Sequence, residues 1–233
     1  MDFLMNLDWA VLLKIIGIDL ILGLDNAMVI ALACATLSAS VRNKAIMIGT
    51  AGAILARVLF LFIGFWLIGL PFVKLVAGAY LAYLGYSLLV TKEEDPDVKS
   101  GNSMWAAIGT IVLADVMMSL DNVIAITSAA SGTGDHGFGY AVFGIVLSIP
   151  IIIFASKFLV TIMDKFPIVI WGGAGLITWV GMEMLLKEQF IANIVGHGTL
   201  HTILMVGVTA ATLGAAFLKN RSIESKGLTV YSD

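Results

Sequence analysis

Long runs of apolar residues, separated by short polar stretches, occupy most of the chain. Each run is close to the ~20 residues that an α-helix needs to cross the hydrocarbon core of a bilayer. The pattern predicts seven spanning helices, at residues 9–36, 43–69, 71–91, 104–131, 138–162, 167–187 and 199–218. We therefore expect an all-α, polytopic membrane protein.

The composition supports a membrane protein. Of the 233 residues, 60% are hydrophobic and only 12% are charged, against about 25% charged residues in soluble domains. The net charge of −3 gives no basic surface for nucleic acid. A lone cysteine, Cys34, excludes an internal disulfide framework. The expected surroundings are a lipid bilayer, and no nucleic-acid partner is expected.

Positive charges are unevenly divided between the two sides that seven spans define. The side of the N-terminus carries only Lys74 and Lys187. The opposite side carries Arg42, Lys44, Lys92, Lys99, Lys165, Lys219, Arg221 and Lys226. By the positive-inside rule, the N-terminus is expected outside the cell, with residues 92–103 as a cytoplasmic linker and 219–233 as a cytoplasmic tail. Glu183 lies four residues before Lys187, which predicts an interfacial ion pair.

The chain contains an internal repeat, which appears when the sequence is shifted by 96 residues against itself. The matched pairs are Asp19 and Asp115, Asp25 and Asp121, Asn26 and Asn122, Pro71 and Pro167, and Gly85 and Gly181. Each unit, 9–91 and 104–187, contains three predicted helices, and an odd number of crossings inverts the second unit relative to the first. Inverted repeats are typical of secondary transporters, whose ligand site lies near the membrane midplane. The helix at 199–218 has no counterpart.

Four acids lie inside predicted spans: Asp19, Asp25, Asp115 and Asp121. An unpaired charge at the membrane centre costs roughly 2.5–3.5 kcal/mol on insertion scales, so four such charges require compensation. Protonation, a polar cavity or a bound metal would each supply it. Pairing with Arg57 and Lys157, which also fall within spans, is the structural alternative.

Helical geometry limits how these groups can converge. Asp19 and Asn26 share one helix face, whereas Asp25 lies about 120° round from Asp19. Gly23, between the two acids, predicts a local opening that exposes backbone carbonyls. Two inverted copies that meet at the midplane would offer mainly oxygen ligands, which suit Mg(II), Ca(II) or Mn(II) better than Zn(II) or Cu(I). Site chemistry does not choose among those three.

The doubled Asp-x-x-x-(Gly/Ser)-x-Asp-Asn pattern, on a seven-helix plan of this length, resembles the TerC family of bacterial integral membrane proteins. Members of that family are associated with Mn(II) export and metal resistance. The resemblance implies a location in the bacterial inner (cell) membrane, Mn(II) as the transported ion and no resident cofactor. The metal-site residues that it implies are Asp19, Asp25, Asn26, Asp115, Asp121 and Asn122.

Export of the ion must be driven by coupling to another flux. No Gly-Lys dipeptide occurs, so the chain has no P-loop for ATP. Moving a dication out against an inside-negative potential costs about 4.6 kcal/mol per 100 mV. Carboxylates that exchange protons for a metal ion would couple the two fluxes. We therefore expect metal/proton antiport by alternating access and no enzymatic activity.

Two alternatives remain open. A membrane partner that supplies Mn(II) to exported enzymes at the translocation site would need the same intramembrane site. An intramembrane aspartyl protease is a remote alternative, suggested by the sequence Gly132-Thr-Gly-Asp135. Asp135, however, falls in a predicted outer loop rather than within a span.

Overall fold

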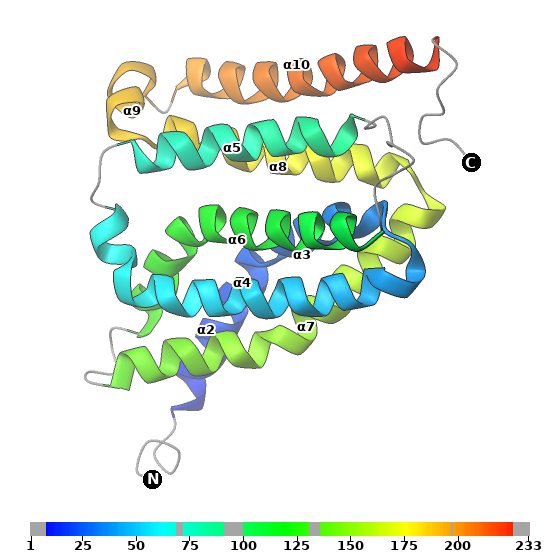
Figure 1. The fold of residues 1–233 in the computed structure, drawn as a ribbon. Coiled ribbons are helices and arrows are strands. Elements are labelled where there is room, and N and C mark those ends of the chain that lie inside the picture. Colours follow the sequence, from blue (N-terminus) through cyan, green and yellow to red (C-terminus); the bar gives the residue numbers. More distant parts are fainter. Residues whose placement is uncertain (1–7, 69–71, 91–99, 131–135, 197, 226–233) are drawn as a thin grey trace.

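Helices make up nearly all of the described chain. The computed structural model describes residues 8–68, 72–90, 100–130, 136–196 and 198–225, without the side chains of 64–68, 100–103, 120, 121, 124, 127 and 224. The helices are α2 (Trp9–Leu22), α3 (Leu24–Ala35), α4 (Ala39–Ile68), α5 (Val73–Leu89), α6 (Ser100–Ala130), α7 (Gly137–Lys165), α8 (Ile168–Leu186), α9 (Gln189–Val195) and α10 (Thr199–Glu224) (Figure 1). No strand occurs in the ranges given, which confirms the all-α class.

Four described helices are long and apolar enough to cross a membrane. They are α4 over Ala39–Ile63, α7, α8, and α10 over Thr199–Ile223, and the bent pair α2–α3 makes a fifth if it is one span. The shorter apolar segments are α5 and the stretch Met104–Ser119 of α6. Each predicted run thus coincides with a helix or with the α2–α3 pair. By length and composition the described residues support four or five spans, and the count of seven stays a prediction.

The helix break at Gly23 agrees with the sequence expectation. Gly23 separates α2 from α3, whose axes differ by 43°. A Cβ atom at this position would lie 2.6 Å from the carbonyl oxygen of Asp19, which is closer than real side chains approach. Only glycine fits this backbone without a shift. At the equivalent residue, Ser119, α6 continues without a break to Ala130.

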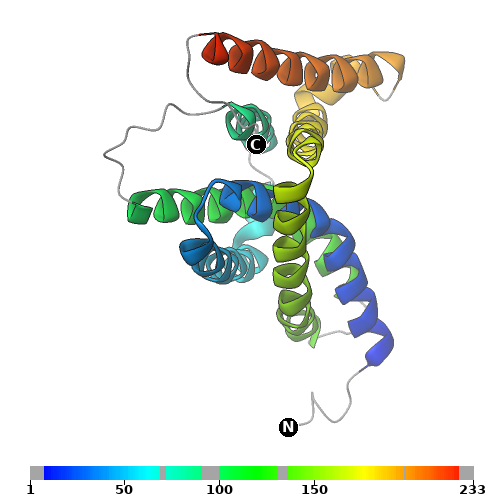
Figure 2. The same cartoon turned by 90° about the vertical axis from the view of Figure 1, so that its right-hand side faces the viewer.

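The helices pack in a definite order across the molecule. α5 packs along α8, α4 along α6, and both α2 and α3 along α7. In Figure 1, α10 runs along one edge, the α5–α8 pair lies beside it, and the other long helices lie beyond. Figure 2 shows the same order from the side. The helices that carry the predicted acids therefore lie together, away from α10.

Two helix interfaces use the same pair of residue types. A Cβ at Gly49 of α4 would lie 2.7 Å from Ile111 of α6, and a Cβ at Gly144 of α7 would contact Ile15 of α2. Ile15 and Ile111 are 96 residues apart in the sequence. In each interface an isoleucine of the acid-bearing helix fills the space that a glycine leaves.

The α5–α8 interface brings two backbones into direct contact. A Cβ at Gly85 would lie 2.7 Å from the carbonyl oxygen of Ala174, and a Cβ at Gly181 would lie 2.7 Å from that of Gly78. The shift of 96 residues relates Gly85 to Gly181 and also Gly78 to Ala174. The contact is therefore reciprocal, and small residues make it possible.

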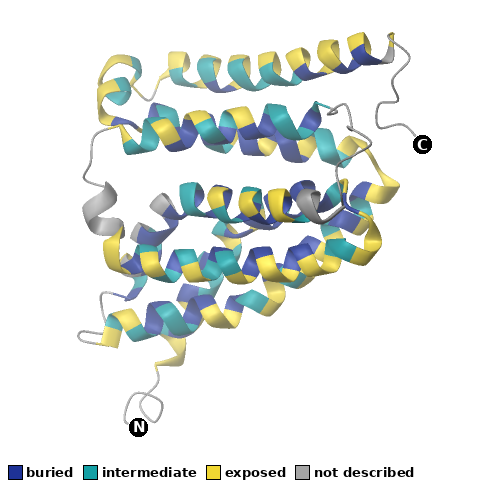
Figure 3. Cartoon of the chain, in the orientation of Figure 1, coloured by how far each residue is buried: buried dark blue, intermediate teal, exposed yellow. Residues whose placement is uncertain are grey.

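Apolar side chains cover much of the outer surface. Figure 3 shows exposed positions along the outward faces of the helices. Large examples from α4, α7 and α10 are Leu55, Leu59, Phe62, Phe154, Phe158, Ile203 and Leu218, each more than half exposed. So much exposed apolar surface is unfavourable in water and is expected of helices that face lipid. Lys187 Nζ lies 3.1 Å from Glu183 Oε1 at an exposed site, which confirms the predicted ion pair.

A second ion pair ties helix ends together. Arg42, near the start of α4, contacts Asp164 of α7 with 2.7 Å between Nη1 and Oδ2. The same guanidinium donates hydrogen bonds to the carbonyl oxygens of Ala35 and Leu37, at and just beyond the end of α3. The last carbonyls of a helix lack partners within it, so Arg42 caps α3 through Ala35 and, through Asp164, holds this end of α3 beside α7.

Candidate functional site

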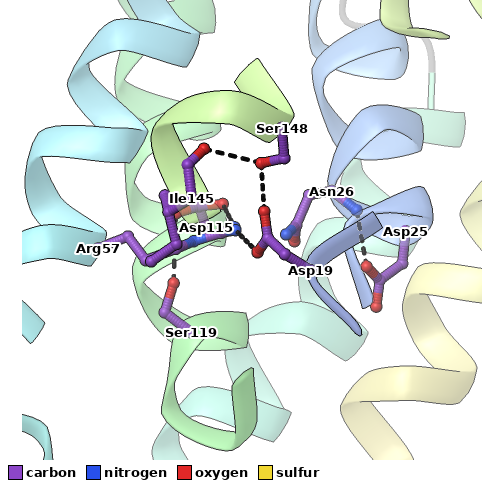
Figure 4. A network of polar contacts seen from close by, with 8 residues as sticks. All are labelled: Asp19, Asp25, Asn26, Arg57, Asp115, Ser119, Ile145 and Ser148. Carbon is purple, nitrogen blue, oxygen red and sulfur yellow. Dashed lines mark hydrogen bonds and ion pairs between the residues drawn. The ribbon is translucent and has the colours of Figure 1, made fainter. Parts of the chain in front are cut away.

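A buried cluster of charged side chains joins α2, α4 and α6 (Figure 4). Arg57 of α4 supplies the cation. Its Nη1 donates to Oδ1 of Asp19 at 2.8 Å, and its Nη2 forms an ion pair with Oδ1 of Asp115. The side chains of Arg57, Asp19 and Asp115 are 3%, 0% and 8% exposed. The two aspartates at equivalent repeat positions thus meet on one guanidinium.

Two serine hydroxyls complete the contacts of the carboxylates. Ser148 of α7 forms a hydrogen bond with Oδ2 of Asp19, and Ser119 donates to Oδ2 of Asp115 at 3.2 Å. Ser148 Oγ also lies 2.8 Å from the carbonyl oxygen of Ile145. Ser148 was not among the predicted site residues. Its one signal in the sequence is that it is a polar residue in an apolar run, and a polar group inside a helix bundle requires a partner.

The cluster carries more negative than positive groups. Two carboxylates face one guanidinium, which leaves one negative charge in excess when both acids are ionised. The sequence left open that the acids pair with Arg57 and Lys157 instead of binding a metal. For Arg57 this pairing is present. It is not present for Lys157, which is exposed and forms no ion pair with any described residue. Protein cations offset the buried acids only in part.

Asn26 and Asp25 lie on different sides of α3. The Asn26 side chain points toward Asp19, whereas the Asp25 side chain points away from the cluster (Figure 4), as the helical spacing predicts. Oδ1 of Asp25 accepts a hydrogen bond of 2.8 Å from the backbone N–H of Asn26, in the first turn of α3. Its negative charge there is favoured by the positive end of the helix dipole.

Amide groups with no hydrogen-bond partner lie in both acid-bearing segments. Asn26 is 3% exposed, and neither its Nδ2 nor its Oδ1 has a partner among the described residues. Asn122 is 5% exposed, and its Nδ2 also has no hydrogen-bond partner among the described residues. The same is true of Nε of Arg57. Buried polar groups normally find partners. The unpartnered groups of Asn26 and Arg57 lie at the charged cluster (Figure 4), where a ligand or a rearrangement can supply partners.

The six predicted metal-site residues are therefore only partly brought together. Asp19 and Asp115 share Arg57, and Asn26 points toward them. Asp25 points away, and the side chain of Asp121 lies outside the described residues. Among the described side chains, no group of three or more histidines, cysteines and acids is arranged to hold a metal ion. Asp135, on which the protease alternative depends, also lies outside the described residues.

Apolar helices around a buried charged cluster define a multi-pass integral membrane protein. The family model described as the integral membrane protein TerC family matches residues 4–225. The chain therefore belongs to the TerC family.

The chain is also similar to three bacterial membrane proteins. It is 41% identical over 206 residues to the uncharacterized membrane protein YjbE of Bacillus subtilis (strain 168), which covers 88% of this chain and 93% of YjbE. It is 28% identical to YkoY of the same organism, over 78% of this chain and 61% of that protein. It is 26% identical to the inner membrane protein YoaE of Escherichia coli (strain K12), over 79% of this chain and 39% of that protein. No solved structure matches the chain.

Proposed function

We propose that this protein is a divalent metal ion transporter, with Mn(II) as the preferred ion, that exports the ion from the cytoplasm. One observation carries the proposal. Asp19 and Asp115, at matching positions of two sequence repeats, meet inside the helix bundle on one guanidinium, and when both are ionised their charge exceeds that of this cation. Buried acids without full charge compensation destabilise a membrane protein. Their presence therefore indicates a function.

The arrangement suits an alternating-access carrier of seven spans in two inverted three-helix halves. The repeat-equivalent residues Ile15 and Ile111 support it, because each packs against a glycine of a neighbouring helix, Gly144 of α7 and Gly49 of α4. The first half would be residues 9–91 and the second 104–187, with α10 as an additional helix. In such carriers the ligand site lies where the halves meet, near the membrane midplane.

The chemistry of the cluster favours a hard cation. Its candidate ligands are carboxylate, amide and hydroxyl oxygens, which suit Mn(II), Mg(II) and Ca(II). Free Cys34 is buried elsewhere in the hydrophobic core, so it adds no thiolate. Membership of the TerC family, whose members are associated with Mn(II) export, is the ground for preferring Mn(II).

Location and direction follow from charge and family. With seven spans, the excess of arginine and lysine on one side supports a cytoplasmic C-terminus, and the family supports a location in the bacterial inner membrane. Export of a dication against an inside-negative potential requires coupling, and acids that release protons when a metal binds would provide it.

Flux through the purified protein tests the proposal. The full chain is reconstituted in liposomes that contain a Mn(II)-sensitive fluorophore, and influx is followed with and without a proton gradient. We expect Mn(II) flux that the gradient accelerates, and loss of flux in Asp19→Asn and in Asp115→Asn. Glu183→Gln is the matched control, because this acid belongs to an exposed ion pair.

The same assay distinguishes the main alternative. A membrane partner that supplies Mn(II) to exported enzymes only together with other proteins would bind the ion but move none when reconstituted alone. Wild-type flux in both single Asn variants would contradict the proposal itself.

A further inference from the structure

The arginine between the two aspartates occupies the place where the transported ion would bind. Nη1 and Nη2 of Arg57 each contact one of the carboxylates, and the guanidinium is almost completely buried. Its Nε–H donor has no partner among the described residues. Among the described residues, the two acids are therefore the only hydrogen-bond partners of the Arg57 side chain.

A dication and a guanidinium compete for these oxygens, because like charges repel at this distance. Each contacted oxygen, Oδ1 of Asp19 and Oδ1 of Asp115, already accepts a charged donor. A metal ion on the same atoms would stand within a few ångströms of Arg57, and its repulsion would be twice that between two single charges at equal distance. Metal binding therefore requires Arg57 to leave at least one carboxylate.

Arg57 also breaks the correspondence between the two repeats. The residue 96 positions later in the chain is Ile153, so the second repeat supplies no such cation. On α7, which packs against α2 and α3, Ser148 takes the polar contact with Asp19. A single arginine thus forms ion pairs with one acid from each repeat, so a change at either acid alters its contacts.

We propose, on the basis of the proposed function, that Arg57 is a tethered counter-cation that competes with the transported ion. With the ion absent, Arg57 neutralises one of the two buried charges and joins the halves through Asp19 and Asp115. When the ion binds, it replaces Arg57 on those carboxylates, and the returning guanidinium assists release. By competing for the carboxylates, Arg57 lowers the affinity of the site for the metal ion, which allows the ion to dissociate.

Metal affinity of the purified full-length protein tests this role. Mn(II) binding is measured by isothermal titration for wild type, Arg57→Lys and Arg57→Gln, and release is followed by rapid mixing with a chelator. We expect Arg57→Gln to bind Mn(II) at least tenfold more tightly than wild type and to release it correspondingly more slowly. Arg57→Lys should fall between them, because one ammonium does not bridge two carboxylates as a planar guanidinium does.

Lys157→Gln is the matched control, since it removes an exposed cation from α7 and should leave the affinity unchanged. If Arg57→Gln does not fold, Arg57→Lys carries the test, and affinity equal to or weaker than wild type in the folded variant overturns the counter-cation role. That result, obtained with a wild-type protein that binds Mn(II), leaves the proposed function standing. Absence of Mn(II) binding in every form overturns both.

Discussion

Removal of Arg57 should destabilise the protein far more than removal of either acid that it contacts. Arg57→Gln leaves the carboxylates of Asp19 and Asp115 buried and without a cation. Breaking a buried ion pair by removing one partner costs about 3–5 kcal/mol, because the remaining charge stays desolvated. We expect a loss of that size in the metal-free protein, and here two like charges are left facing each other.

Asp115→Asn should have a much smaller effect. Arg57 keeps its contact with Asp19, and the new amide oxygen still accepts a hydrogen bond from Nη2. The substitution weakens the hydrogen bond from Arg57, because a charged acceptor becomes a neutral one, and a hydrogen bond to a charged group contributes about 1.5–3 kcal/mol. It also removes the excess negative charge of the cluster. A net loss of about 1 kcal/mol follows.

Equilibrium unfolding in detergent micelles, without added metal, measures this difference. The variants are compared with Lys157→Gln, whose exposed cation should alter the free energy of unfolding by less than about 0.5 kcal/mol. An Asp115→Asn protein that is less stable than Arg57→Gln would show that the cluster lacks surplus negative charge.

Three further changes test the fold and its breaks. Gly181→Ala should destabilise by about 1–3 kcal/mol, because the added methyl meets the backbone of α5 at 2.7 Å; Gly172→Ala on the same helix, where the methyl meets nothing within 4 Å, should be neutral or slightly stabilising in thermal unfolding. Gly23→Ala should slow Mn(II) flux in liposomes by displacing the carbonyl of Asp19, and unchanged flux would show that the close approach has no role. Arg42→Ala should lower the free energy of unfolding by about 1–2 kcal/mol, because it removes hydrogen bonds to two carbonyl oxygens. Asp164→Ala removes only an exposed ion-pair partner and should lower it by less than about 1 kcal/mol. Equal losses in the two variants would contradict the capping role.

The fold class followed from the length of the hydrophobic runs, because a run of ~20 apolar residues matches a spanning helix, whereas a strand of a membrane barrel needs only ~9–11 residues. The break between α2 and α3 was also predictable, since Gly23 stands between two acids in an apolar run. The packing of α5 against α8 was not foreseen. Gly85 and Gly181 were matched as repeat positions, but the sequence does not state that each faces the other's helix.

The site was predictable in part. The repeat identified Asp19 and Asp115 as equivalent, and the spacing placed Asp25 on another face. The role of Arg57 could not be decided from the sequence, because pairing with the acids and coordination of a metal by the acids satisfy the same charge requirement. Ser148 was missed, since an isolated serine in an apolar run carries no spacing pattern, and its contact with α2 depends on how α7 packs.

The central claim is that one carboxylate from each half holds the same ion. Electron paramagnetic resonance of Mn(II) added to the purified protein measures bound ions per chain and tests this directly. We expect one bound Mn(II) in wild type and in Glu183→Gln, and none at the same concentrations in Asp19→Asn or in Asp115→Asn. One Mn(II) bound with wild-type affinity in either of these single variants would contradict it.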